Sequence, residues 1–183
     1  KNFEAPVGQS IKKNTILLNS LYKNIPFELT NSQKVAIEEI SQGLEKPNRM
    51  IRLLQGDVGS GKTIVALAAL FQASGNSKQA AMMAPTELLA RQHFESIKNL
   101  CLKSNIKVEI LTGKTKRLDR ERIVHDLSAG DIDIILGTHA LFQDKISFHN
   151  LGLVVIDEQH RFGVHQRLSL TSKNSNNPPD III

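Results

Sequence analysis

Short apolar runs alternate with stretches of helical periodicity along most of this 183-residue chain. The apolar runs contain no regular polar alternation, which is typical of strands that are buried on both faces of a parallel sheet. Between them, apolar residues recur three or four positions apart, which predicts helices packed on that sheet. We expect strands at 50–55, 80–84, 108–111, 132–136 and 151–156, and a further strand starting near the last residues, 181–183.

This regular order of strands and helices predicts an α/β fold, namely a doubly wound, mostly parallel sheet with helices on both faces. Thr30 or Asn31 can cap one helix, and Thr86 begins another. Ligands bind sheets of this class beyond the carboxyl ends of the strands. The expected core positions are Val35, Ala36, Ile37, Ile40 and Leu44 in the first helix, and Leu88, Leu89, Phe94, Ile97 and Leu100 in the second.

The first 25 residues lack this alternation. Residues 11–21 have the spacing of an amphipathic helix, which Pro26 ends because the residue before a proline is driven out of helical geometry. We interpret residues 1–25 as a linker or tail of an upstream domain, and residues 26–183 as one α/β domain. The chain begins with Lys1 rather than methionine, which indicates part of a longer protein.

One strand end carries a glycine-rich loop of the pattern G-x-x-x-x-G-K-T. Its glycines allow successive backbone N–H groups to turn toward one point, where they and a helix N-terminus favour a polyphosphate. Lys62 is expected to reach the β- and γ-phosphates of ATP, and Thr63 to bind Mg²⁺. A chance match is the alternative, and the flanking apolar runs weigh against it. The predicted nucleotide-binding residues are Gly56, Asp57, Val58, Gly59, Ser60, Gly61, Lys62 and Thr63.

Two carboxylates, Asp157 and Glu158, follow the apolar run at 151–156. Beside Mg²⁺–ATP, Asp157 can hold the metal together with Thr63, and Glu158 can orient the water that attacks the γ-phosphate. A solvated acidic turn is the alternative. Together with Lys62, these two carboxylates are the predicted catalytic groups.

Gln159 and His160 come directly after the two carboxylates. A site whose hydrolysis is coupled to a second ligand needs polar groups between the γ-phosphate region and the neighbouring motif, and these two side chains are placed for that coupling role. Taken alone, His160 is more typical of a structural hydrogen-bonding residue, and we assign it no proton transfer.

Composition and charge narrow the class of protein. Apolar residues make up 40% of the chain and the net charge is +5, which suits a globular protein and is compatible with a polyanionic partner. Basic residues gather between Lys114 and Arg122, although such a run is usually a solvated helix face. The single cysteine, Cys101, excludes an internal disulfide and is expected to be a buried thiol. No membrane-spanning stretch or secretory signal is visible, so we expect a reducing cytoplasmic location.

The run DEQHRFGV that begins at Asp157 resembles the DEQH box of superfamily 2 helicases. Within that superfamily the chain resembles the RecG family of bacterial ATP-dependent DNA branch-migration helicases, over residues 26–170. Phe27 to Thr30, with Gln33, resembles the adenine-reading Q motif of these proteins. The other matching segments are GDVGSGKT at 56–63, APTELLARQH at 84–93, LTGK at 111–114, GTHALFQ at 137–143 and HQR at 165–167.

The resemblance implies a RecA-like P-loop domain that uses ATP and Mg²⁺ and acts on branched DNA, such as forks and four-way junctions, in replication-fork restart and recombination. It implies that Gln33 hydrogen-bonds the adenine and that Phe27 stacks or packs beside it, with plain core packing as the alternative for Phe27. It also implies contacts to the DNA backbone, for which helix capping or tight turning is the alternative. The implied DNA-contacting residues are Pro85, Thr86, Arg91, Gly113 and Thr138.

In that family the last strand continues into motif III and a second RecA-like domain, and a wedge domain that recognises branched DNA lies upstream. The chain ends before motif III, so we expect the arginine fingers of the motor, worth a factor of ~10³–10⁵ in rate, to lie outside it. We therefore expect weak nucleotide binding, slow hydrolysis and no unwinding by the chain alone, in a protein of the bacterial cytoplasm and nucleoid. Two other interpretations stay open: a related motor, either a translocase such as the transcription-repair coupling factor Mfd or an RNA helicase, and a nucleotide-binding interaction module.

Overall fold

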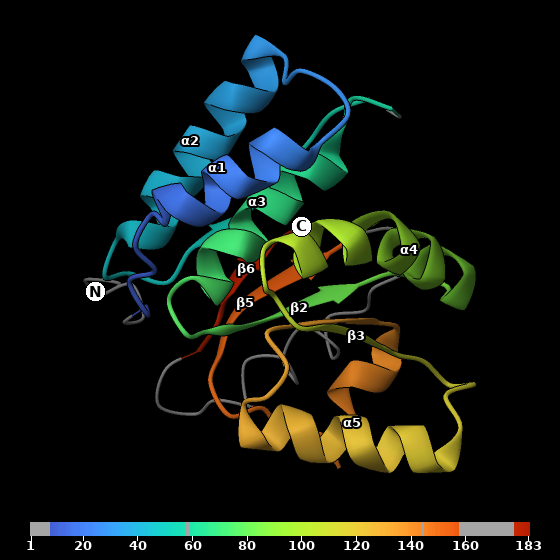
Figure 1. The fold of residues 1–183 in the computed structure, drawn as a ribbon. Coiled ribbons are helices and arrows are strands. Elements are labelled where there is room, and N and C mark those ends of the chain that lie inside the picture. Colours follow the sequence, from blue (N-terminus) through green and yellow to red (C-terminus); the bar gives the residue numbers. More distant parts are fainter. Residues whose placement is uncertain (1–7, 58, 144, 158–177) are drawn as a thin grey trace.

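The computed structural model describes residues 8–57, 59–143, 145–157 and 178–183, which are arranged as Figure 1 shows. The helices are α1 (Thr15–Asn24), α2 (Asn31–Glu45), α3 (Lys62–Ser74), α4 (Glu87–Lys103) and α5 (Arg117–Ala129), with a 3-10 helix η1 (His139–Phe142). The strands are β1 (Ile51–Arg52), β2 (Gln79–Met83), β3 (Val108–Leu111), β4 (Ile134–Gly137), β5 (Leu151–Ile156) and β6 (Asp180–Ile182). None of the described helices has the length and apolar character needed to cross a lipid bilayer.

The six strands form one parallel sheet in the order β1-β6-β5-β2-β4-β3. Because all strands run the same way, the segments that follow them leave from one edge, the carboxyl edge of the sheet. The predicted parallel sheet is confirmed. β1 has only two residues where the sequence predicts a strand over 50–55. Ile51 in β1 and Leu53 directly after it are exposed at the end of the sheet.

Alternate residues of the central strands face two separate cores. In β2, Ala80 and Met82 belong to one core, and Ala81 and Met83 belong to the other. Helices α1 to α4 cover the first core, and α5 lies on the opposite face of the sheet with the second (Figure 1). Since both faces are covered, apolar residues are favoured at every strand position, which explains the missing alternation in the sequence. The predicted doubly wound arrangement is confirmed.

Threonine side chains fix the starts of α2 and α4. Thr30 Oγ1 accepts a hydrogen bond from the Gln33 N–H at 3.2 Å, and Thr86 Oγ1 accepts one from the Leu89 N–H at 3.3 Å. Each bond satisfies a backbone donor that has no partner within its helix. Both helices therefore begin where the sequence predicts.

The buried faces of these two helices differ from the prediction. Val35 is 57% exposed and Leu88 is 77% exposed, although the sequence pattern predicts both in the core. The buried stripes run through Leu44 in α2 and Ile97 in α4. Val35 precedes Leu44 by nine positions, as Leu88 precedes Ile97. At about 100° per residue nine positions make two and a half turns, so the two members of each pair lie on opposite sides of their helix. Cys101 lies on the buried stripe, and burial raises the pKa of its thiol to about 12, which confirms the predicted structural thiol.

Residues 8–25 pack onto the α/β domain. Ile11, before α1, and Leu18 and Leu21, on α1, are buried in the first core. The Ile11 N–H donates to Leu44 O at 2.7 Å, and buried Gln72 donates Nε2 to Ile11 O at 2.8 Å. The helix predicted over 11–21 forms at Thr15–Asn24. The interpretation of residues 1–25 as the tail of an upstream domain stays a prediction, to which the structure adds that residues 8–25 are anchored to this one.

Buried polar side chains close the amino edge of the sheet. Gln79, the first residue of β2, donates Nε2 to Leu127 O at 2.9 Å and to Ile132 O at 3.0 Å. Its Oε1 accepts the Asn150 N–H at 3.0 Å. One amide therefore joins the end of α5 to the starts of three neighbouring strands.

Asp180 has a similar role at the start of β6. It is 1% exposed, and its carboxylate accepts the Met50 N–H at 2.6 Å. Burial raises the pKa of Asp180 to about 6, against the opposing effects of the Met50 N–H and the positive charge of Arg49. The edge strand β1 is therefore held to β6 by a carboxyl group that the surrounding protein keeps from water.

Candidate nucleotide and nucleic-acid site

The glycine-rich loop joins β1 to α3 at the carboxyl edge of the sheet. Gly61 is the N-cap residue of α3 and has φ 80° and ψ 31°, a left-handed conformation that glycine adopts without steric cost. The Ser60 N–H donates to Asp57 O at 3.1 Å and closes a turn within the loop. The first N–H groups of α3 have no acceptor inside the helix and lie at its positive end. The loop thus has the local geometry of an anion-binding site.

Gln33 connects the start of α2 to this loop. Its Nε2 donates to Ser60 O at 2.9 Å, and its Oε1 accepts the Thr30 N–H at 2.9 Å. A Cβ atom on Gly61 would displace the Gln33 amide from this contact, and the left-handed φ of Gly61 strains any other residue there. The amide keeps one further N–H and one further lone pair, which the predicted adenine contact would use. That contact stays a prediction.

The Lys62 side chain folds back onto the loop. Its Nζ donates to Gly56 O at 2.6 Å and to Asp57 O at 3.0 Å. Both acceptors are backbone carbonyls, so the ammonium is held at the loop without neutralisation by either of them. An ammonium has three N–H donors and no acceptor, and a phosphate oxygen can therefore replace these carbonyls.

Asp157 directly follows β5 at the same edge. Its N–H donates to Met83 O at 2.8 Å, which continues the ladder between β5 and β2. One strand, β6, lies between β1 and β5, so the loop and Asp157 are separated by two strand spacings, roughly 10 Å.

The donor atoms at this edge fit Mg²⁺ better than a soft metal. The side chains of Thr63 and Asp157 carry oxygen atoms, the kind of ligand that Mg²⁺ prefers. Among the described residues no group of three or more His, Cys, Asp or Glu could hold a metal by itself. A cation here would therefore take its remaining ligands from phosphate and water, as Mg²⁺ bound together with a nucleotide does.

Four predicted site residues lie outside the part of the chain that the structure describes. They are Val58 of the loop, and Glu158, Gln159 and His160 after Asp157. The water-orienting role of Glu158 and the coupling roles of Gln159 and His160 stay predictions.

His93 is a residue of this edge that the sequence patterns did not single out. Its Nε2 lies 2.7 Å from Asp157 Oδ2, and the two side chains are 15% and 29% exposed. Because an ionised carboxylate can only accept, the imidazole N–H donates. His93 comes three residues after Ala90 and four before Ile97, on the buried stripe of α4. A polar residue on an apolar stripe is the signal by which the sequence could have indicated it.

Three predicted DNA-contacting residues follow neighbouring strands. Thr86 comes after β2, Thr138 after β4 and Gly113 after β3, and β4 lies between the other two in the sheet. Thr86 caps α4 and follows half-buried Pro85. Thr138 is 6% exposed and lies at the turn that leads into η1. Within the fold, Thr86 is therefore a capping residue and Thr138 a turn residue. Gly113 is exposed, and a Cβ atom there would meet nothing within 4 Å. Contact of these residues with DNA stays a prediction.

Arg91 and Lys114 share one carboxylate beside this row. Arg91 donates Nε and Nη2 to Glu87 Oε1 at 3.1 Å and 2.9 Å. Lys114 Nζ lies 3.8 Å from Glu87 Oε2. Glu87 therefore reduces the positive charge that these two side chains offer to a polyanion.

The predicted basic run is largely paired within the domain. Arg117 donates Nε to Glu121 at 2.8 Å, and Arg122 donates Nη1 to Glu109 at 2.9 Å. The hydrogen bond and charge of Glu109 raise the pKa of Arg122. These pairs agree with the interpretation of a solvated helix face.

Phe27 lies at a surface hollow of about 580 Å³ between α1 and α2. Leu18, Tyr22 and Ile37 also line the hollow. The Phe27 side chain is 52% exposed, so plain core packing does not describe it. Stacking of Phe27 on a nucleotide stays a prediction.

Comparison with known proteins gives the family and several similar proteins. Residues 30–179 match the family described as DEAD/DEAH box helicase. The ATP-dependent DNA helicase RecG of Streptococcus pneumoniae serotype 4 is 48% identical over 160 residues, which are 87% of this chain and 23% of that protein. RecG of Bacillus subtilis strain 168 is 49% identical over 160 residues, with the same coverage. The chain thus spans about a quarter of the length of these curated relatives.

Solved structures agree with this sequence similarity. The structure of RecG bound to a three-way DNA junction matches 96% of this chain and 23% of its own, with a TM-score of 0.86 and 41% identity. The Hef helicase domain of Pyrococcus furiosus matches 88% of this chain and 33% of its own, with a TM-score of 0.64 and 23% identity, a likeness of fold alone. The predicted RecA-like fold and the predicted resemblance to RecG are confirmed.

Proposed function

The chain belongs to the DEAD/DEAH box helicase family, and from this premise we propose that it is the ATP-binding first motor domain of an ATP-dependent DNA helicase that acts on branched DNA. One observation supports this function above the others. The glycine-rich loop, Asp157 and the row of Thr86, Thr138 and Gly113 all follow strands of a single parallel sheet. In a motor, the residues that bind nucleotide and those that bind nucleic acid must belong to one connected structure, because binding of one ligand must change the affinity for the other.

ATP with Mg²⁺ is the proposed cofactor. The N–H groups at the start of α3 would hold the phosphates, and Lys62 would exchange its loop carbonyls for β- and γ-phosphate oxygens. Thr63 and Asp157 would hold Mg²⁺, and Glu158 would orient the attacking water. Gln33 would contact the adenine through the remaining groups of its amide.

Branched DNA is the proposed substrate, including forks and four-way junctions. The similarity to RecG supports it, since a RecG structure is described as bound to a three-way DNA junction. Thr86, Arg91 and Gly113, with Pro85 and Thr138, would contact the DNA backbone, which positions a strand without reading its bases. The proposed setting is replication-fork restart and recombination in the bacterial cytoplasm, at the nucleoid.

A second RecA-like domain and an upstream wedge domain are proposed as the partners of this domain. The curated relatives are about four times as long as the matched region, which leaves room for both. An arginine finger from a second domain is worth a factor of ~10³–10⁵ in rate. The chain alone is therefore expected to bind nucleotide weakly, to hydrolyse it slowly and not to unwind DNA.

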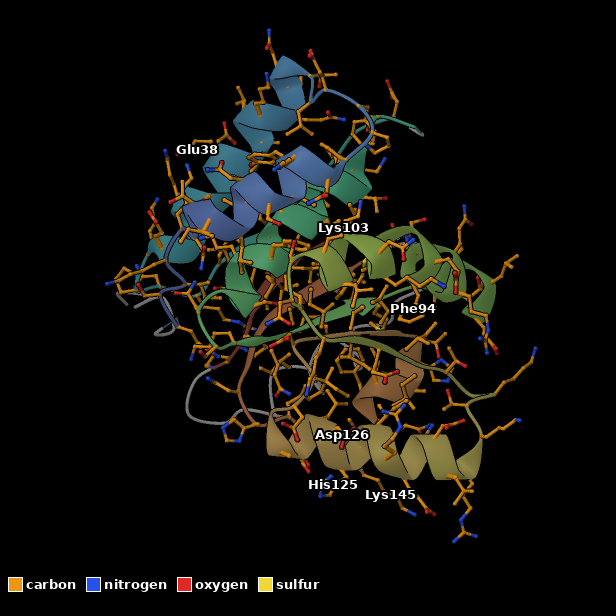
Figure 2. All side chains as sticks on the ribbon, in the orientation of Figure 1. Glu38, Phe94, Lys103, His125, Asp126 and Lys145 are labelled. Atoms are coloured by element: carbon orange, nitrogen blue, oxygen red, sulfur yellow. The ribbon has the colours of Figure 1, made fainter. Side chains whose placement is uncertain are left out.

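Equilibrium binding of a fluorescent, non-hydrolysable ATP analogue tests the nucleotide half of this function. Excess MgCl₂ is expected to strengthen binding relative to excess EDTA, and Lys62→Ala to remove most of it. The control is Lys103→Ala, at the far end of α4 (Figure 2), which should leave binding unchanged. Binding that is indifferent to Lys62→Ala would contradict the proposed site.

Measurements of ATP hydrolysis and DNA binding test the proposed DNA-dependent activity. In the full-length protein, a labelled three-way DNA junction is expected to bind and to stimulate hydrolysis, whereas stimulation by an RNA junction alone would indicate an RNA helicase. Nucleotide binding with no hydrolysis in either case would indicate an interaction module, against which the intact Lys62, Thr63 and Asp157 weigh. Rapid DNA-stimulated hydrolysis by the chain alone, abolished by Lys62→Ala, would contradict the proposed need for a second domain.

A further inference from the structure

One hydrogen bond joins α4 to the proposed Mg²⁺ ligand. His93 on α4 donates from Nε2 to Asp157 Oδ2 at 2.7 Å, across 64 positions of the chain. We propose that His93 is a positioning residue that orients the Asp157 carboxylate for Mg²⁺ and ties that orientation to the position of α4. This inference rests on the proposed function of the site.

The Asp157 backbone is fixed by other contacts, which leaves only the side chain for His93 to orient. The Asp157 N–H is held by Met83 O at 2.8 Å in the ladder with β2. Its carboxylate, in contrast, can rotate about its side-chain bonds. A hydrogen bond to Oδ2 selects one rotation and leaves Oδ1 for a cation. Asp157 is only 29% exposed, so water competes weakly for this bond.

Hydrogen bonds that orient a metal ligand have measurable consequences. A carboxylate that is already oriented loses less conformational freedom when the cation arrives, and removal of such an orienting partner typically weakens metal affinity about 10–100-fold. The effect appears only when the metal is present. A residue that merely stabilises the fold would change nucleotide binding equally with and without Mg²⁺.

The same helix begins at the proposed DNA-contacting row. Thr86 caps α4, and Glu87 and Arg91 lie in its first two turns, directly before His93. A helix of this length moves as a rigid element, so a strand that shifts its first turns would also shift His93. His93 thereby gives the DNA side of the domain a direct contact with the metal side.

Three variants separate positioning from stabilisation. His93→Leu removes the donor, and His93→Gln replaces it with another N–H donor on a flexible side chain. His125→Leu is the matched control, because His125 lies on α5, on the opposite face of the sheet from α4 (Figure 2). His93→Phe preserves the ring volume and replaces His93→Leu if that variant does not fold, which circular dichroism would reveal.

The readout is the Kd of the fluorescent, non-hydrolysable ATP analogue in excess MgCl₂ and in excess EDTA. His93→Leu is expected to weaken binding about tenfold in MgCl₂ and not at all in EDTA. His93→Gln should recover most of the loss, and His125→Leu should match the wild type. Equal weakening in both conditions, an unchanged Kd in MgCl₂, or no recovery in His93→Gln would overturn the positioning role. A wild-type chain without Mg²⁺-strengthened binding would instead refute the proposed function itself, and this inference with it.

The link to α4 is tested by repeating the MgCl₂ titration with a saturating DNA oligonucleotide. DNA is expected to change the wild-type Kd, and His93→Leu is expected to reduce that change. If DNA changes the Kd of His93→Leu as much as that of the wild type, or does not change the wild-type Kd, the proposed link between α4 and Asp157 is wrong. The positioning role of His93 is decided separately, by the comparison of MgCl₂ with EDTA.

Discussion

The two edges of the sheet use their polar side chains in opposite ways. At the amino edge, Gln79 and Asp180 are 4% and 1% exposed, and their hydrogen bonds hold neighbouring backbone segments together. At the carboxyl edge, Lys62, Thr86 and Asp157 stay in contact with solvent, and their bonds are made within a loop, a helix cap or a single side-chain pair.

The difference follows from the direction of the chain. Each helix that follows a strand starts at the carboxyl edge, so unpaired N–H groups and positive helix ends gather there and favour anions. At the amino edge the helices end and the strands begin, so backbone groups must be satisfied by the protein itself. Substitutions at the amino edge should therefore affect folding, and those at the carboxyl edge should affect ligands.

The largest expected effect is at the amino edge. Gln79→Leu would remove three hydrogen bonds of a buried amide, including those of the Ile132 carbonyl and the Asn150 N–H, which is expected to lower the free energy of unfolding by about 3 kcal/mol. Urea denaturation measures it. Gln42→Leu, at an exposed position of α2, is the control and should change stability by less than about 0.5 kcal/mol. Equal effects of the two variants would remove the contrast between the edges.

Lys62→Ala, at the carboxyl edge, should weaken ligand binding and leave folding stability unchanged. Loss of the ammonium is expected to weaken binding of the ATP analogue in MgCl₂ about a hundredfold, or about 2.7 kcal/mol, because hydrogen bonds to charged groups are lost. The same variant should unfold at the wild-type urea concentration, since Lys62 bonds only to carbonyls of its own loop. A large loss of stability would show that the carboxyl edge also depends on its polar side chains for folding.

The stability of the fold should depend on pH through Asp180, the buried carboxyl group at the amino edge. The pKa of Asp180 is raised from 3.8 to about 6, so the folded state binds its proton more tightly than the unfolded state does. The resulting stability is fully present below the unfolded pKa of 3.8 and is lost as the pH rises through about 6. Over that window the wild type should lose roughly 2 kcal/mol more than Asp180→Asn, measured by urea denaturation at several pH values. Parallel pH profiles would contradict the effect of burial on this carboxyl group.

The smallest expected effect concerns charge at the carboxyl edge. Glu87→Gln would release Arg91 and Lys114 from their shared carboxylate, and is expected to raise affinity for a labelled DNA junction about threefold, with a steeper dependence on salt. Fluorescence anisotropy at several salt concentrations measures both. Glu95→Gln, a change of equal charge on the same helix, is the control. Weaker DNA binding by Glu87→Gln would show instead that Glu87 positions the two cations.

Local signals in the sequence predicted the elements well and their faces less well. The starts of α2 and α4 depend on threonine caps within three residues, so a short window contains the whole cause. The exposure of Val35 and Leu88 depends on which side of each helix meets the sheet, and their apolar character alone does not decide that. Likewise, the shortness of β1 reflects its position at the end of the sheet, a property of the assembled strands.

The sequence by itself determined the glycine-rich loop before a helix, the parallel α/β order and the candidate site residues that follow several strands, because these depend on neighbours along the chain. Only the tertiary structure decided which strand ends lie side by side, since local periodicity does not encode strand order. It therefore also decided that His93 bonds Asp157, that Glu87 lies between Arg91 and Lys114, and that Gln79 joins three strands. Except for the Glu87–Arg91 pair, which lies four positions apart on one helix, those contacts join residues far apart in the sequence, and they exist because packing two cores on one sheet brings the segments together.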